Sequence, residues 1–321
     1  MSSILSSTHF HNEEAAYAFV EARLWPDGPV CPHCGAVKDH VGKLNGKSTR
    51  PGLYKCYACR KPFTVKMGTV MESSHVPLRI WLQAIYLMNS SKKGISTRQL
   101  QRTFQCGMKT AWFLSHRIRE AMNDIRIEAS GPLGGERKPV EADETYIGGK
   151  EKNKYRSRRT SAVGGVGKQI VFSLVERNGR VRSHHVPEVS AKTLRPIMVA
   201  QIDKRSFLMT DDAGQYRYMG RDFARHEAVN HGIEEYVRGA AHTNTAENFF
   251  SILKRGIVGC YFHVSQEHLH RYLAEFDFRY SNRSALGIED VQRAELALKG
   301  TKGKRLTYRT TSGSRSAEAS A

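Results

Sequence analysis

Three acidic residues in the second half of the chain have the types and positions that a divalent-metal site needs. Asp143 lies in VEADETYIGG, within or just after an expected strand, Asp211 directly follows SFLMT, and Glu247 lies near the start of a helical stretch. Carboxylates at strand ends and on a facing helix offer the oxygen ligands that magnesium prefers, with room for waters and a phosphate substrate. Two such ions can activate an attacking oxygen and stabilise a leaving one in phosphodiester chemistry.

The acids of the two strands also have an ordinary structural interpretation, which the sequence leaves open. A single acid at the end of a strand is commonly a solvated turn residue or a helix cap. Asp212 is an alternative ligand to Asp211, and Glu141 and Glu144 flank Asp143. The choice among these carboxylates therefore depends on the direction in which each side chain points.

The helical stretch HTNTAENFFSILKRG raises the same question for Glu247. Asn244 or Thr245 could cap the helix. Glu247 and Lys254 are seven residues apart, so they share one helix face with a separation of about 10 Å along the axis. This face is either a solvated edge with an ion pair that contributes little, or one wall of an active site.

A second group with metal-binding chemistry consists of four cysteines in two CxxC pairs. Cys31 and Cys34 form the first pair, Cys56 and Cys59 form the second, and twenty-one residues separate the pairs. Four thiolates at this spacing can surround one zinc ion tetrahedrally from two turns. In a large, lysine-rich chain whose start has no secretory signal, the pattern predicts a structural zinc site rather than disulfides.

Basic residues accompany the cysteines and the helices expected after them. Two helices around a short turn, at about 96–104 and 109–122, have the size of a helix-turn-helix, although a plain helical hairpin is the alternative. The second helix carries Lys109, Arg117 and Arg119 and could enter a major groove. Seven basic residues around the cysteines suit a DNA-contacting ribbon: Lys38, Lys43, Lys47, Arg50, Lys55, Arg60 and Lys61.

The charge of the whole chain favours a polyanionic partner. Lysine and arginine together number 50 against 31 acidic residues, a formal net charge of +19. No run of eighteen or more apolar residues occurs, which argues against a membrane-spanning helix. Because the N-terminus also has no basic start before its short apolar stretch, we expect a cytoplasmic protein.

Hydrophobic periodicity and turn residues predict an α/β (α+β) chain with helices before and after a strand-rich stretch. The glycine- and proline-rich stretch GPLGGERKP at 131–139 is the best candidate for a domain boundary. Strands that alternate with helices after this point form an α/β pattern. The expected elements are helices at 12–24 and 77–89, the helix pair, a strand in VEADETYIGG, a hairpin about Asn178-Gly179, a helix capped by Ser190, the strand SFLMTDD, and helices at 243–257 and 265–281.

Several stretches of the chain resemble bacterial insertion-sequence transposases of the ISXO-like type. They include CPHCG…CYACRKPFTV, VEADETYIGGK, LMTDD and HTNTAENFFSILKRGIVGCYFHVSQEHLHRYLAEFDFRYSNR, and together they span roughly 20–285. The resemblance implies a zinc ribbon before a ribonuclease H-like DDE domain, whose mixed sheet is flanked by helices. We therefore expect an N-terminal helix and ribbon at 1–76, a helix-turn-helix at 77–130, a catalytic domain at 135–296 and a basic disordered tail at 297–321.

The resemblance also implies roles for individual residues. Asp143, Asp211 and Glu247 would be the catalytic carboxylates, and they would hold two magnesium (or manganese) ions in addition to the structural zinc. Asp212 stands where the family has a glutamate. Lys254 matches a basic residue expected to contact DNA near the cleaved phosphate, and the full expected DNA-binding set is Lys254, Arg255, Lys109 and Arg117.

The function that the resemblance implies is transposition. The protein would bind the terminal inverted repeats of its element, hydrolyse a phosphodiester to expose a 3′-hydroxyl, and use that hydroxyl to attack target DNA. Because two ends must be joined, we expect a homodimer or a higher assembly on double-stranded DNA. Two alternatives remain: a zinc-ribbon DNA-binding regulator whose acids are structural, and a structure-specific nuclease of the same fold.

Overall fold

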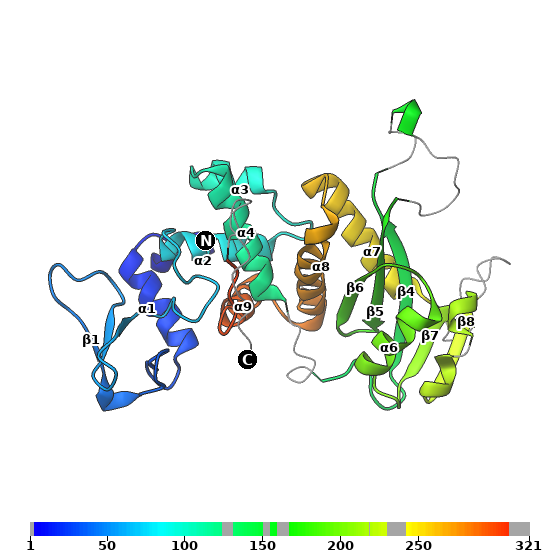
Figure 1. Ribbon diagram of the computed structural model, residues 1–321, viewed down its shortest axis with the longest axis horizontal. Helices are drawn as coiled ribbons and strands as arrows, with labels where there is room; N and C mark the ends of the chain where they lie inside the picture. Colours follow the sequence, from blue (N-terminus) through cyan, green and yellow to red (C-terminus); the bar gives the residue numbers. More distant parts are fainter. Residues whose placement is uncertain are drawn as a thin grey trace, which may run out of the picture.

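The computed structural model describes residues 3–123, 131–149, 155–158, 167–217, 219–229 and 242–307 (Figure 1). The basic run KEKNKYRSRR at 150–159 lies outside these residues except at 155–158, where a short 3-10 turn forms. Most of the expected tail, from 308 onward, is also outside them. Among the described residues, no helix has the length and apolar character needed to cross a membrane.

The N-terminal region combines one helix with a small antiparallel sheet. Helix α1 (Glu13–Leu24) begins after Asn12, whose side chain accepts the N–H of Ala15 at 2.9 Å, as the sequence predicts. The sheet consists of strands β1 (Val41–Lys43), β2 (Tyr54–Cys56) and β3 (Pro62–Phe63) in that order. These short strands carry the turns on which the cysteines lie.

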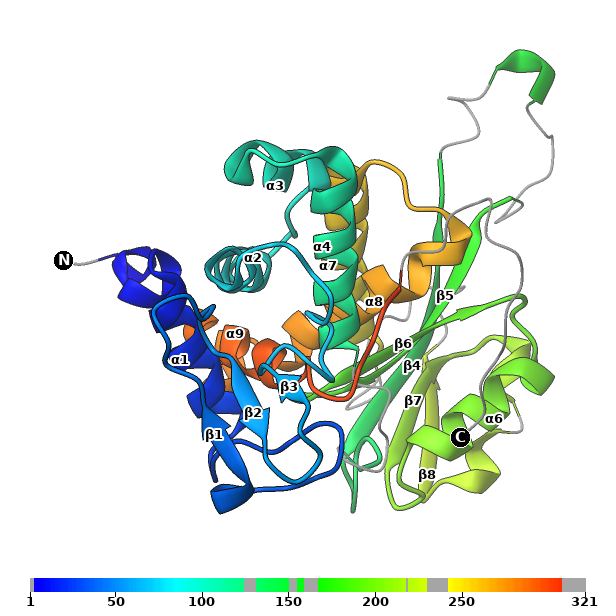
Figure 2. The ribbon, with the colours of Figure 1, turned by 60° about the vertical axis from the view of Figure 1, so that its left-hand side comes forward.

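Four helices from both ends of the chain share the next core. They are α2 (Leu78–Ser90), α3 (Thr97–Phe104), α4 (Met108–Met122) and α9 (Asp290–Lys299). Ala297 and Leu298 of α9 are buried among the apolar residues of α1, α2 and α4, and Figure 2 shows α9 beside α1 and α2. The C-terminal helix, which the sequence analysis did not predict, therefore returns to the N-terminal part of the protein.

The remainder of the protein is built on one mixed five-stranded sheet. Its strands are β4 (Pro139–Ile147), β5 (Gln169–Glu176), β6 (Val181–Val186), β7 (Phe207–Asp211) and β8 (Arg225–Val229), in the order β6-β5-β4-β7-β8. Strands β5 and β6 form the expected antiparallel hairpin, whereas β4, β7 and β8 run parallel to one another. The predicted α/β class is confirmed.

Helices cover both faces of this sheet, as expected from the sequence. On one face, α6 (Ala191–Gln201) packs on a core that contains Val140 and Ala142 of β4. On the other face, α7 (Asn244–Gly256) and α8 (Gln266–Ser281) pack on a core that contains Ile147 of β4 (Figure 1). Because side chains alternate along a strand, the odd-numbered residues of β4 point to the side of α7.

A buried ionic cluster connects the helical part to the sheet part. Glu275 of α8 accepts a hydrogen bond from Arg119 of α4 at 2.7 Å and another from the hydroxyl of Tyr261 at 2.6 Å. Arg279, one turn further along α8, contacts the same carboxylate and also donates to the carbonyl of Met88 in α2. Three elements distant in sequence are thus held by one carboxylate with no exposed surface.

Candidate active site and cysteine cluster

Strands β4 and β7 bring Asp143 and Asp211 to the same level of the sheet. The two strands are parallel neighbours, and Glu141 is paired with Met209. Asp143 and Asp211 each follow this pair by two residues, so they lie on the same face of adjacent strands. This is the face on which α7 packs, because β4 alternates between the two cores.

Helix α7 adds Glu247 on the same side of the sheet. The helix packs against β4 and β5, and Glu247 lies in its first turn with an exposed side chain. We expected Asn244 or Thr245 to cap this helix, and that prediction is wrong. The N-cap position is Thr243, which makes no side-chain capping bond, and the carboxylate of Glu141 from β4 accepts the first backbone N–H groups instead.

The electrostatics at Asp143 show that these acids interact with one another. Burial raises the pKa of the Asp143 carboxyl to about 7, although a hydrogen bond from the backbone N–H of Glu144 at 2.7 Å acts in the opposite direction. The negative charges of Glu144, Asp211 and Glu247 raise this pKa as well. A cation bound among these carboxylates would offset their repulsion, and an all-oxygen donor set suits a hard divalent cation such as magnesium.

The neighbouring acids that the sequence left as alternatives have other surroundings. Glu144 lies on the opposite face of β4 from Asp143, where its carboxylate accepts hydrogen bonds from Tyr216 and, at 2.8 Å, from Gln215. Asp212 is the next residue after β7 and lies in a bend, where its backbone N–H donates to the carbonyl of Val229 at 3.0 Å. Asp143 and Asp211 are the pair that the register aligns.

The two basic residues expected on α7 lie on its exposed surface. Lys254 and Arg255 are both exposed in the last turn of the helix. Within the described residues, Glu247 and Lys254 form no ion pair with each other. The polar face of α7 is therefore open to solvent from its first turn to its last, and its two ends carry opposite charges.

Helix α4 presents less of its surface than a groove-reading helix would. Lys109 is exposed in the first turn, but most of the helix from Ala111 onward is buried. Arg117 is 7 % exposed, and its guanidinium donates to the backbone carbonyls of Glu72 and Leu306 at 2.9 and 3.1 Å. Arg117 thus holds chain segments together, and we do not propose it as a DNA contact.

Further exposed basic side chains lie on α3 and in the loop before it. Lys92, Lys93, Arg98 and Arg102 are all exposed. They were not predicted from the sequence, because the DNA-reading surface was expected on the second helix of the pair. Arg98 and Arg102 are four residues apart on the helix face opposite the buried Leu100, and this spacing could have identified them as exposed.

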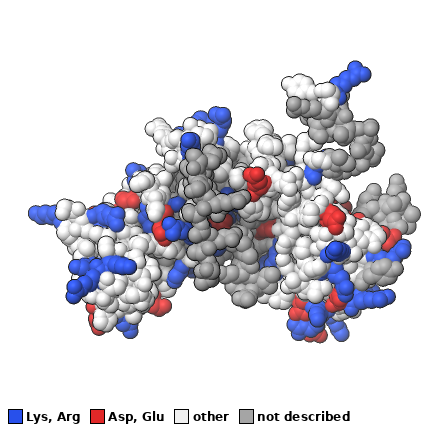
Figure 3. Space-filling model, in the orientation of Figure 1, with Lys and Arg blue, Asp and Glu red and all other residues white. Residues whose placement is uncertain are grey.

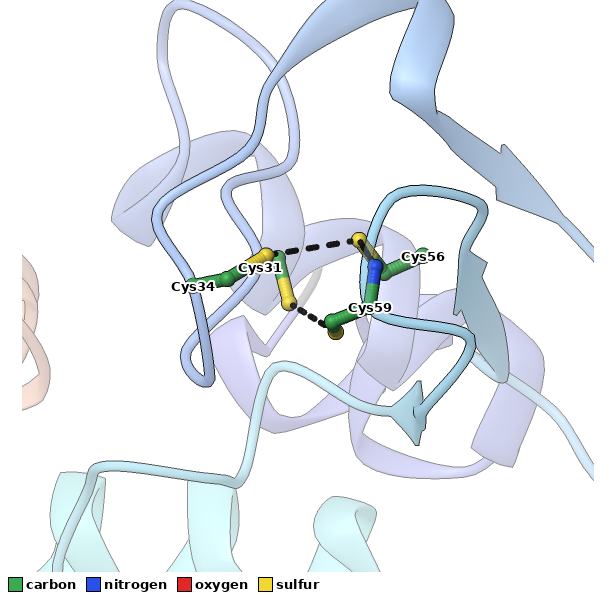
Figure 4. A group of neighbouring side chains, drawn as sticks. All are labelled: Cys31, Cys34, Cys56 and Cys59. Carbon is green, nitrogen blue, oxygen red and sulfur yellow. Dashed lines mark hydrogen bonds between the residues drawn. The ribbon is translucent and has the colours of Figure 1, made fainter.

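The four cysteines converge into one cluster (Figure 4). Their sulfur atoms all lie within 4.8 Å of one another, with Cys31 to Cys59 at 3.7 Å and Cys34 to Cys56 at 3.6 Å. A tetrahedral ion with sulfur ligands at about 2.3 Å requires sulfur separations of about 3.8 Å, so the cluster fits zinc. Among the described residues, it is the only group of three or more metal-binding side chains gathered so closely.

The surface around this cluster is basic. All seven lysine and arginine residues noted around the cysteines in the sequence are exposed, and Figure 3 shows basic side chains gathered over this end of the molecule. Lys43 is partly engaged, because it pairs with Glu21 of α1 at 3.2 Å. The other basic side chains of the ribbon give it a positive surface that suits a polyanion.

Comparison with known proteins gives two family matches and one relative. Residues 11–62 match the model of a transposase zinc-ribbon domain, and residues 132–281 match that of an ISXO2-like transposase domain. A Halobacterium salinarum protein, described as an uncharacterized protein in transposable element ISH50, is 30 % identical over 282 residues. The aligned region covers 84 % of this chain and 91 % of the relative.

Proposed function

Because the chain belongs to the family of ISXO2-like transposases with an N-terminal transposase zinc ribbon, we propose that it binds the terminal inverted repeats of its element and catalyses metal-dependent strand cleavage and strand transfer. The observation that carries the proposal is the alignment of Asp143 and Asp211 on neighbouring parallel strands, with Glu247 near enough for its charge to raise the pKa of Asp143. The catalytic domain is ribonuclease H-like in this proposal.

Asp143, Asp211 and Glu247 would hold the magnesium ions. When bound, such ions supply Lewis-acid stabilisation of the charge that develops on phosphate oxygens during an in-line displacement. The protein contributes the positions: two carboxylates fixed by strand register and a third on a helix packed across them. Burial and the neighbouring negative charges raise the pKa of the Asp143 carboxyl, so a bound cation would compete with a proton there.

DNA would be held by the basic surfaces on either side of this site. Lys254 and Arg255 lie on the helix that carries Glu247, where they can contact the backbone next to the reacting phosphate. The basic ribbon, Lys109 and the exposed arginines of α3 would bind the element end further away. Since two ends must be joined, the active form is a homodimer or a larger assembly on DNA.

The proposal is tested by incubating the purified protein with a duplex that carries the element end, a target plasmid and magnesium. A transposase yields 3′ ends covalently joined to the target. A structure-specific nuclease cleaves without joining, and a regulator binds the end without cleaving it. Either of the last two outcomes would refute the proposal.

The zinc ribbon leads to a separate prediction. The Sγ atom of Cys56 lies 3.6 Å from that of Cys34, and Cys56→Ser removes it from the set of four sulfur ligands. We expect the zinc content, measured by inductively coupled plasma mass spectrometry, to fall from one ion per chain to nearly none, with loss of end binding. Cys106→Ser, outside the cluster, is the control and should keep its zinc. Unchanged zinc in Cys56→Ser would refute the ribbon assignment.

A further inference from the structure

One buried carboxylate that the proposed chemistry does not use is Glu141, two residues before Asp143 on the same face of β4. Its side chain has no exposed surface. One oxygen accepts the backbone N–H groups of Thr245 and Ala246 at 2.8 and 2.9 Å. The other accepts from the Thr245 hydroxyl at 2.9 Å and from the Arg177 guanidinium at 2.5 Å.

These contacts leave Glu141 no capacity to act as a metal ligand. An ionised carboxylate offers about four lone-pair sites, and the four donors already occupy them. The ring nitrogen Nδ1 of His242 lies 3.2 Å from the same carboxylate as a further neighbour. Glu141 therefore differs from Asp143, although both point to the same face of the same strand.

Arg177, which bonds to Glu141, also contacts the segment just before α7. Arg177 lies at the hairpin end of β5, and its Nη2 atom donates to the backbone carbonyl of His242 at 2.8 Å. Its positive charge compensates the buried carboxylate. Glu141 and Arg177 therefore both bond to the backbone at the entry to α7: Glu141 accepts from Thr245 and Ala246, and Arg177 donates to His242.

The bond pattern at the start of α7 corresponds to a helix cap supplied from a distant strand. Thr245 and Ala246 are among the first residues of the helix, whose N–H groups have no intrahelical acceptors. A carboxylate at this end also interacts favourably with the helix dipole. The sequence separation is 104 residues for Thr245, so the cap joins two elements that no local signal connects.

Resting on the proposed function, we propose that Glu141 is a positioning residue, which fixes the first turn of α7 and thereby sets Glu247 opposite Asp143 for metal binding. Asp143 follows Glu141 by two residues, and Glu247 directly follows Ala246. The Glu141 side chain thus links the strand that carries Asp143 to the first turn of the helix that carries Glu247. Residues that hydrogen-bond metal ligands directly change metal affinity or activity about 10- to 100-fold when mutated, and we expect an effect of this order from a residue that fixes the ligand's helix.

The test compares Glu141→Gln with Glu176→Gln in the full-length protein. Glu176 is a matched control, since it is 9 % exposed, lies on the adjacent strand and pairs with Arg180 at 3.7 Å, but faces the opposite side of the sheet from α7. Two quantities are measured without DNA: manganese binding by calorimetry, and hydrogen exchange at the amides of Thr245 and Ala246.

We expect Glu141→Gln to bind manganese roughly 10- to 100-fold more weakly and to exchange these two amides faster. Glu176→Gln should match the wild type in both measurements. Wild-type manganese affinity in Glu141→Gln would overturn the inference, as would unchanged exchange at α7. A purely structural role would lower the unfolding temperature without weakening metal binding in the folded protein, and this result would also overturn it.

Two further variants keep the inference separate from the proposed active site. Glu247→Gln should itself weaken manganese binding; if it does not, the proposed metal site fails, whatever Glu141 does. If Glu141→Gln does not fold, Arg177→Lys keeps the positive charge but gives up the forked contact to Glu141 and His242. Its manganese binding should then weaken in the same direction, and unchanged binding would overturn the inference.

Discussion

Glu247→Gln is expected to abolish strand cleavage and joining while leaving the affinity for element ends unchanged. The amide has nearly the same size and lies on an exposed part of α7, so the helix should remain folded. The substitution removes one negative ligand from the proposed metal site. Metal ions contribute several kcal/mol to the stabilisation of such transition states, so we expect a loss of roughly 1,000-fold or more.

Asp212→Asn provides the matched control for this prediction. It also removes one carboxylate next to the proposed ligand Asp211, but position 212 lies beyond the end of β7, outside the strand that aligns Asp211 with Asp143. This variant should retain cleavage and joining to within about tenfold, whereas Asp211→Asn should behave like Glu247→Gln. Gel-shift titration separates end binding from catalysis. Normal joining by Glu247→Gln would refute the active-site assignment.

Glu275→Gln is expected to lower the free energy of unfolding strongly, because it removes the carboxylate shared by two buried arginines. Burial alone raises the pKa of Glu275, but the charges of Arg279 and Arg119 outweigh this effect and hold the pKa below its usual value. Removing the carboxylate leaves two buried guanidinium groups without their common partner. Breaking a buried ion pair in this way costs about 3–5 kcal/mol of unfolding free energy.

Urea denaturation followed by circular dichroism measures this loss, and Glu267→Gln is the control. Glu267 lies in the first turn of the same helix with an exposed side chain, so its removal should cost less than about 1 kcal/mol. Since Glu275 is stabilised as the ion, its contribution should also decrease on acidification, as the carboxylate becomes protonated. Equal stabilities of the two variants would contradict this account of the α4–α8 contact.

Local signals in the sequence predicted most of the secondary structure correctly. Asn12 and Ser190 cap α1 and α6 as expected, and Asn178 adopts the positive φ of 54° at the turn between β5 and β6. These features depend on a few neighbouring residues, whose capping and turn chemistry is independent of the remaining fold. The two CxxC pairs likewise indicated their cluster by spacing alone.

Features that depend on distant contacts were not predicted. Strand β8 and α9 were both missed. Helix α9 has a local signal, the capping box of Glu289 and Gln292, but its return to α2 depends on packing between elements far apart in the chain. The burial of Arg117 was missed for a related reason: its partners are backbone carbonyls 45 and 189 residues away. Charge and helical position alone do not distinguish such an arginine from one that contacts DNA.

At the candidate site, too, local features were predictable from the sequence and long-range contacts were not. Asp143, Asp211 and Glu247 were selected by residue type, strand context and family resemblance. The alternative at Glu144 could be set aside only once the sheet placed its carboxylate on the opposite face, where it bonds to Gln215. The role of Glu141 was not accessible from sequence, since its main partner segment begins 104 residues away.

The central claim is that Asp143, Asp211 and Glu247 form one divalent-metal site beside bound DNA. Its most direct test is a crystal structure of the full-length protein with an element-end duplex and manganese, in which anomalous scattering locates the ions. We predict manganese within bonding distance, about 2.0–2.3 Å, of oxygens from all three residues, with Lys254 on the DNA backbone and not on Glu247. Manganese bound elsewhere, or Glu247 paired with Lys254 beside ordered DNA, would contradict the claim.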